Sequence, residues 1–158
     1  MKRHPIRYYR RNSPQALARV LFMLMIADDG LGRREIDTLA RLQVFRQLEI
    51  KRSLFVEVAR SFCADLLDTQ DAVGRIDLLD STRIDAVLAA VDDQPKRTLV
   101  CALAFNVIVA DDGFCASEVD VFKHVLIRWN LTVDDLYQQL LRDNEPAPQR
   151  GVPLRLAA

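Results

Sequence analysis

Two acidic turns in this sequence carry the residue types and the spacing of a divalent-cation site. Residues 26–35 read IADDGLGRRE, and residues 109–118 read VADDGFCASE. Each turn ends an apolar run with two aspartates and a glycine, and a glutamate follows five positions after the glycine. All-oxygen ligands suit Ca²⁺, Mg²⁺ or Mn²⁺. If the turns approach each other, we expect the metal ligands to be six carboxylates, those of Asp28, Asp29, Glu35, Asp111, Asp112 and Glu118.

Helix capping explains part of the same pattern without a cation. Gly30 and Gly113 suit a left-handed cap at the end of a helix. Glu35 and Glu118 fall near the third position of the next helix, where a carboxylate reaches back to free N–H groups. Capping leaves the doubled aspartate unexplained, so both interpretations stay open. Two arginines inside the first turn neutralise it, which makes the second turn the better candidate, and neither turn has the ligand spacing of an EF-hand.

The two turns belong to an internal repeat. A shift of 83 positions aligns residues 20–44 with residues 103–127 without a gap. Apolar residues face apolar ones at most of the other positions of the first helix in each copy. This predicts two related helical hairpins that pack about a pseudo-two-fold axis. Seven aligned pairs are identical: Phe22/Phe105, Ala27/Ala110, Asp28/Asp111, Asp29/Asp112, Gly30/Gly113, Glu35/Glu118 and Asp37/Asp120.

The paired segments IADDGLGRREID and VADDGFCASEVD resemble the ADG-x(5)-E-type signatures of the tellurite-resistance TerB-like family, which carries one signature in each half of a helical domain. The signature has five residues between glycine and glutamate, whereas this sequence has four. The glutamate stands five positions after the glycine in both turns, and we count this spacing as agreement with the signature. The similarity covers about residues 14–141. It implies a compact helical fold, an acidic surface for divalent cations, and a place among stress and metal-resistance proteins. It implies no known reaction.

The elements that must position these turns are all helical, and the fold class we predict is all-α. No alternating β pattern of useful length occurs. Residues 1–12 are predicted to form a basic flexible arm, residues 13–144 a single TerB-like helical domain, and residues 145–158 a flexible tail. About seven helices are expected, over residues 14–27, 33–48, 51–67, 82–91, 94–110, 116–129 and 133–143.

Catalytic chemistry finds little support in the composition. The two histidines, His4 and His124, stand apart, and no serine or cysteine lies in a recognisable nucleophile motif. The three cysteines form no CxxC pair, which is typical of reduced thiols. The longest apolar stretch has twelve residues, too few for a bilayer span of about 20. We therefore expect a cytoplasmic protein that is not an enzyme and has no membrane contact.

The function predicted from these features is that of a non-enzymatic TerB-like interaction protein, related to stress responses and holding a divalent cation (Ca, Mg or Mn) at its acidic turns. The protein partner is not specified by the sequence, and one exposed apolar stripe would serve a homodimer. The alternative is an adaptor that binds nucleic acid or another anionic partner through the basic arm. With 22 basic and 22 acidic side chains, the chain has no overall preference for polyanions, so nucleic acid is the less favoured partner.

Overall fold

The structure, a computed structural model, describes residues 7–25, 33–67, 81–110 and 116–144. All regular elements in these ranges are helices, which confirms the all-α prediction. In chain order they are α1 (Pro14–Met25), α2 (Arg33–Arg41), α3 (Val44–Gln47), α4 (Arg52–Leu67), α5 (Ser81–Leu88), α6 (Gln94–Ala110), α7 (Ala116–Trp129) and α8 (Val133–Asn144).

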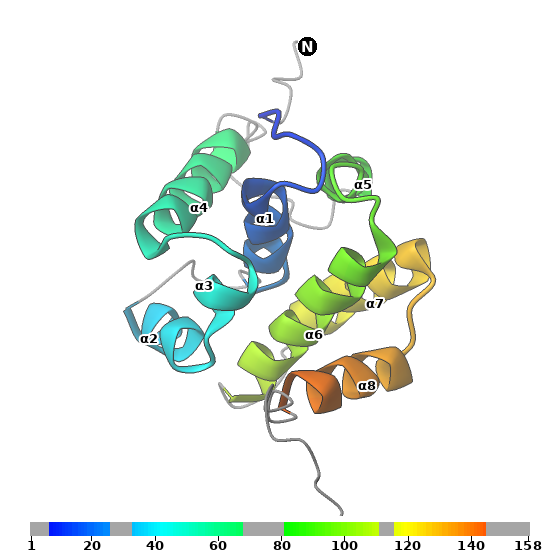
Figure 1. Ribbon diagram of the computed structural model, residues 1–158. Coiled ribbons are helices and arrows are strands. Elements are labelled where there is room, and N and C mark those ends of the chain that lie inside the picture. Colours follow the sequence, from blue (N-terminus) through cyan, green and yellow to red (C-terminus); the bar gives the residue numbers. More distant parts are fainter. Residues whose placement is uncertain (1–6, 26–32, 68–80, 111–115, 145–158) are drawn as a thin grey trace, which may run out of the picture.

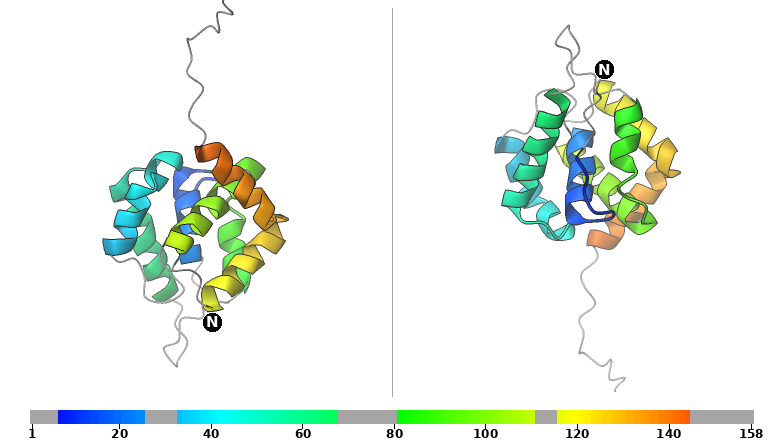
Figure 2. Two further views of the ribbon diagram at one scale, coloured as in Figure 1. Left: turned by 90° about the horizontal axis from the view of Figure 1, so that it is seen from below. Right: turned by 90° about the horizontal axis from the view of Figure 1, so that it is seen from above.

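Helix α1 occupies the middle of the fold. Figures 1 and 2 show α2, α3 and α4 on one side of α1 and the helices from α5 to α8 on the other. Every residue from Ala16 to Leu24 is buried. The sequence predicts this position, because residues 20–27 are apolar on every side and a helix without a polar face belongs inside a fold.

Three pairs of helices make the largest contacts. Helix α4 packs along α1, and α8 packs along α6, while α1 and α6 also pack against each other. Smaller contacts join α1 to α7 and α2 to α6. The core between them contains fully buried large side chains such as Phe22, Phe55, Leu103 and Leu136. Burial of one such side chain stabilises the fold by about 1.5–3 kcal/mol.

Local capping signals in the sequence place two of the helix starts correctly. The Ser13 hydroxyl accepts a hydrogen bond from the Ala16 N–H at 3.2 Å, directly before Pro14 begins α1. At α8, the Thr132 hydroxyl accepts from the Asp135 N–H at 3.2 Å, and the Asp135 carboxylate accepts from the Thr132 N–H at 2.8 Å. This reciprocal pair is a capping box, as the spacing predicts.

The prediction of one continuous helix over residues 33–48 is wrong. The chain turns at Leu42 and Gln43, and the helix is split into α2 and the single turn α3. Gln43 has a φ of 57°, in the left-handed region that glycine favours, so a helix cannot pass through it. A glutamine gives no sequence signal for this conformation, which is why the break was not predicted.

The chain closes α3 and α7 with the same cap. Glu49 and Asn130 have φ values of 56° and 54°, and each is followed by a buried apolar residue, Ile50 or Leu131. Both caps show the two hydrogen bonds of a Schellman motif. They are Glu49 N–H to Arg46 O (3.1 Å), Ile50 N–H to Phe45 O (3.0 Å), Asn130 N–H to Ile127 O (3.2 Å) and Leu131 N–H to Leu126 O (2.9 Å).

These caps lie 81 positions apart, whereas the acidic turns lie 83 apart. Between Val44 and Phe55, each buried residue has a buried counterpart at the shorter offset. If the two segments are copies, as the identities at the acidic turns predict, the first has two extra residues, and they fall where Leu42 and Gln43 interrupt the helix. The corresponding buried pairs are Val44/Val125, Leu48/Trp129, Ile50/Leu131 and Phe55/Leu136.

Candidate functional site

The structure describes only part of the predicted cation site. Glu35 lies in the first turn of α2 and is half-buried. For Glu118, the structure describes the helix that carries it, α7, in which it is the third residue. The four aspartates of the turns, Asp28, Asp29, Asp111 and Asp112, lie outside the described residues.

The predicted metal ligands consequently stay a prediction. Within the described ranges, no three side chains of His, Cys, Asp or Glu gather closely enough to hold a metal ion. The position of Glu35 in the first turn of its helix suits the capping interpretation, because a carboxylate there meets the positive end of the helix dipole. Helix α2 also carries Asp37, whose carboxylate lies 3.6 Å from the Arg52 guanidinium of α4.

Residues 7–12, the described part of the basic arm, contact the helical body. Arg7 donates to the Ser61 hydroxyl at 2.8 Å and forms an ion pair with Asp65 at 3.2 Å, both on α4. The buried Arg19 of α1 donates to the Arg7 carbonyl, and its guanidinium lies 4.7 Å from the centre of the Tyr9 ring. The Arg7 side chain is therefore engaged by a hydroxyl and a carboxylate of the protein itself, and its carbonyl accepts from Arg19.

Arg19 is an exception inside an otherwise apolar helix. Its side chain is 3% exposed, and its Nε–H finds no acceptor among the residues that the structure describes. Burial lowers the pKa of this guanidinium from its usual range, while Tyr9 and Asp65 act in the opposite direction. The contacts with Arg7 and Tyr9 compensate part of the cost of burying a cation, so the arm stabilises α1 where it covers Arg19.

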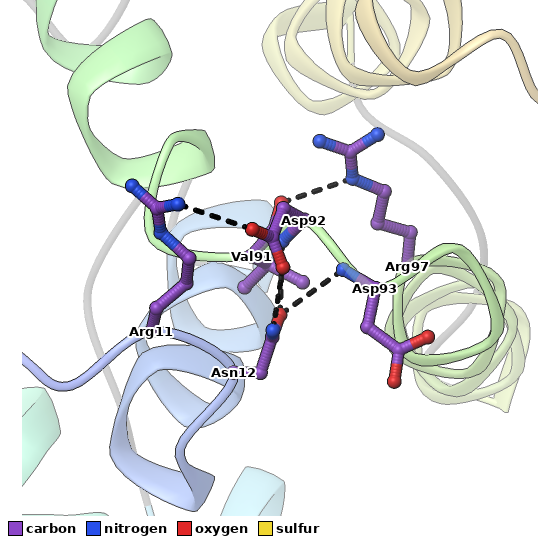
Figure 3. Close-up of polar contacts among 6 residues, drawn as sticks. All are labelled: Arg11, Asn12, Val91, Asp92, Asp93 and Arg97. Atoms are coloured by element: carbon purple, nitrogen blue, oxygen red, sulfur yellow. Dashed lines mark hydrogen bonds and ion pairs between the residues drawn. The ribbon is translucent and has the colours of Figure 1, made fainter.

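A second group of contacts joins the arm to the turn between α5 and α6, and we call it the Asn12 clip (Figure 3). The Asn12 side-chain oxygen accepts from the Asp92 and Asp93 N–H groups at 2.9 and 3.1 Å. Its side-chain amide donates to the Asp92 carboxylate, which also pairs with Arg11 at 3.2 Å. Arg97 donates to the Val91 carbonyl at 2.9 Å.

The clip has an electrostatic consequence for Asp92. The hydrogen bond from the Asn12 amide, followed by the charge of Arg11, lowers the pKa of this carboxyl below its usual value. Asn12 itself has a φ of 60°. Asparagine tolerates this left-handed conformation better than most residues, and its side chain satisfies two backbone donors of the turn. The clip is therefore a structural joint between the arm and the helix pair α5 and α6.

His124 takes part in a small group of ionisable side chains that joins two helices. Its Nε2 lies 3.0 Å from the Asp85 carboxylate, and the Arg128 guanidinium approaches the same carboxylate at 3.8 Å. All three side chains are partly exposed, and they link α5 to α7. His124 therefore lies partly exposed on a helix and is paired with a carboxylate of a neighbouring helix.

An apolar row on α8 is the surface feature that most resembles a binding site. Val133, Tyr137 and Leu141 follow one another at intervals of four residues and are 48%, 54% and 60% exposed. We call these three side chains the α8 stripe. Tyr137 also stacks edge-on against Phe105 of α6, with the ring centres 6.0 Å apart. The contact holds the middle of the stripe in place, which gives it a defined shape.

Comparisons with known proteins identify no relative. No family model, no curated protein and no solved structure matches the chain. The resemblance to the TerB-like family thus rests on the two acidic signatures alone. Within the described residues, none of the helices has the length and apolar character needed to cross a bilayer.

Proposed function

We propose that this protein is a non-enzymatic, TerB-like helical module that acts by binding protein partners, and that a second copy of the chain is one of them. The observation that carries the proposal is the α8 stripe. Isolated exposed apolar residues are common, but three in one row with an ordered tyrosine at the centre form a contiguous patch on the order of 300 Å². Patches of this size often mark interaction sites.

The stripe is suited to pairing with itself. Tyr137 lies midway between Val133 and Leu141, so a two-fold axis at Tyr137 places the smaller valine of one copy opposite the larger leucine of the other. In this antiparallel arrangement, the acidic first turn of α8, with Asp134, lies toward the basic last turn of the partner helix, with Arg142. A ridge of residues four apart also packs readily into the matching groove of another helix.

The size of the patch sets the expected strength. Two stripes bury on the order of 600 Å² together, below the total of about 1,200 Å² that stable complexes bury. We therefore expect a weak, concentration-dependent dimer.

Sedimentation velocity over a range of protein concentrations tests this function. The proposal predicts that the sedimentation coefficient of the native chain rises with concentration, and that Tyr137→Glu keeps the chain monomeric. Ile127→Glu is the matched control, because Ile127 is 81% exposed but lies on α7, outside the stripe. A native chain that stays monomeric throughout, or equal behaviour of the two variants, contradicts the proposal.

The TerB-like part of the proposal has support in how the helices pack. Helix α4 covers α1 as α8 covers α6, and α1 touches α7 as α6 touches α2. The Schellman caps after α3 and α7 add a repeated local feature. These reciprocal relations are those expected of two hairpins about a pseudo-two-fold axis.

A divalent cation at the acidic turns belongs to the same proposal. Saturating Ca²⁺, Mg²⁺ or Mn²⁺ should raise the melting temperature, since a ligand at about 100 times its dissociation constant adds roughly 2.7 kcal/mol of stability. The double variant Asp111→Asn with Glu118→Gln should remove this rise. If no metal shifts the melting temperature of the native chain, the turns only cap helices.

The alternative function, an adaptor for nucleic acid or another anionic partner, is less well supported by the arm. Arg7 and Arg11 are engaged in ion pairs with Asp65 and Asp92. A polyanion would have to displace both carboxylates. Deletion of residues 1–12 and a salt titration of binding to single-stranded DNA test it, because phosphate contacts give a steep loss of affinity with salt.

A further inference from the structure

The fold contains an apolar groove on the side of α1 opposite to α8. It lies between α2 and α4 and has a volume of about 350 Å³. Phe22 of α1 is among its lining residues, with Ile36 of α2 and the α4 residues Val56, Ala59, Arg60 and Cys63. Volumes of about 300–1,000 Å³ are typical of pockets that bind small molecules.

Small side chains on α4 leave this space open. With the 81-residue offset of the two Schellman caps, Val56 corresponds to Tyr137 and Ala59 to Leu140. In the second copy, Tyr137 stacks against Phe105, the residue that aligns with Phe22. The second copy thus fills with a large aromatic side chain the region that the first copy leaves as a groove.

The groove has one charged group among its lining residues. Arg60 is exposed and forms no hydrogen bond or ion pair with other residues that the structure describes. Arg52, at the start of α4, is not among the lining residues, and its guanidinium is paired with Asp37. Burial raises the pKa of the Cys63 thiol, which keeps it neutral at physiological pH.

We propose that this groove binds a free aliphatic monocarboxylate of medium chain length. The hydrocarbon chain lies against Phe22 between Ile36 and Val56, and the carboxylate meets the Arg60 guanidinium. The chemistry follows from the lining, because apolar walls favour a hydrocarbon and a lone guanidinium favours an anion with two oxygens. Binding is noncovalent and requires no metal, and it does not depend on the α8 stripe.

Octanoate is the probe for this site, and amide chemical-shift perturbation of the full chain is the measurement. We expect saturable shifts on α2 and α4 with a dissociation constant between about 10 μM and 1 mM. Octanol, which has the chain without the charge, and acetate, which has the charge without the chain, should both bind more weakly. Octylamine carries the opposite charge and should be the weakest of the eight-carbon probes.

Variants separate the two parts of the recognition. Ala59→Leu fills the groove and should abolish binding, and Val56→Phe should do the same if Ala59→Leu does not fold. Arg60→Gln should weaken octanoate about three- to five-fold, as expected for a partly solvated ion pair, and leave octanol unchanged. Arg128→Gln on α7 is the matched control for loss of a surface arginine and should bind as the native chain does.

Alkylation of Cys63 gives a second, independent readout. Bound octanoate should slow the reaction of Cys63 with iodoacetamide in the native chain but not in Ala59→Leu. The proposal is overturned if millimolar octanoate shifts no residue of α2 or α4, or if folded Ala59→Leu and Val56→Phe chains bind it like the native chain. Equal affinities for octanol and octanoate would overturn the role of Arg60 and with it the assignment to a carboxylate.

Discussion

Replacement of Asn12 tests how the arm is joined to the body. Asn12→Ala removes the acceptor for the Asp92 and Asp93 N–H groups and puts alanine at a φ of 60°. At about 0.5 kcal/mol for each partly exposed hydrogen bond, the lost acceptor costs about 1 kcal/mol. The variant also loses the amide donor to the Asp92 carboxylate, which adds to this cost. The left-handed conformation costs alanine about 1 kcal/mol more. We therefore expect a loss of at least about 2 kcal/mol, or at least about 4 °C in melting temperature.

Asn12→Gly separates these two contributions. Glycine also lacks the acceptor and the amide donor but adopts a positive φ at little cost, so thermal unfolding should show a loss about 1 kcal/mol smaller than that of Asn12→Ala. Equal losses in the two variants would refute the conformational part of the reasoning. No loss in either would refute the clip itself.

The same joint predicts a dependence on pH. The pKa of Asp92 is lowered in the folded chain, first by the Asn12 amide, so its contribution to stability is present above the unfolded pKa of about 3.9 and is lost as the pH falls through the folded value. The difference in stability between the native chain and Asn12→Ala should therefore narrow as the pH falls below about 4. Urea unfolding at pH 7 and at pH 3 measures it, and a difference that widens in acid contradicts the assignment.

Three further predictions concern α8 and the core. Thr132→Ala should cost about 1 kcal/mol in urea unfolding through loss of the capping box, and Thr132→Ser should restore most of it. Leu136→Ala should cost about 2–5 kcal/mol because Leu136 is fully buried, whereas Leu136→Met should cost less than about 1.5 kcal/mol. Burial raises the pKa of Cys101 to about 12, so iodoacetamide should modify Cys101 only on unfolding. Modification of native Cys101 as fast as of Cys63 would contradict this.

Local signals and strong periodicity made much of the fold predictable. The serine before Pro14 and the Thr132–Asp135 pair carry their capping chemistry within four residues, so no tertiary information is needed. The apolar character of α1 on every side predicts its central place. The ends of α7 agree with the predicted range, 116–129.

The helix break at Leu42 and Gln43 depends on the left-handed backbone conformation of Gln43, and a glutamine in the sequence does not predict that conformation. The sequence does contain one signal for the break. The offset that aligns the two halves of the chain changes from 83 to 81 residues, so that Val44 pairs with Val125 instead of Ile127. The identical pairs that define the alignment end at Asp37/Asp120, before the break, so they give no evidence of the change in offset. Burial in the folded chain makes the shorter offset evident.

The proposed interaction surface, the α8 stripe, could be predicted from the sequence only in general terms. The spacing of Val133, Tyr137 and Leu141 is visible in the sequence, but a stripe with this period is usually core. Which stripe of α8 is buried depends on how it packs on α6. Leu136 is fully buried, whereas Tyr137 touches Phe105 of α6 and is still 54% exposed. The groove beside α4 depends in the same way on the separation of two helices that are not adjacent in sequence.

Disulfide trapping of Tyr137→Cys tests the proposed self-association most directly. If a two-fold axis passes through this position, the two introduced β-carbons come within the spacing of about 3.5–4.5 Å that a disulfide requires. Mild oxidation at high protein concentration should then yield a covalent dimer on a non-reducing gel. Ile127→Cys and the native chain, with its own three cysteines, should yield only background. Absence of the dimer, or an equal yield from Ile127→Cys, would contradict the account.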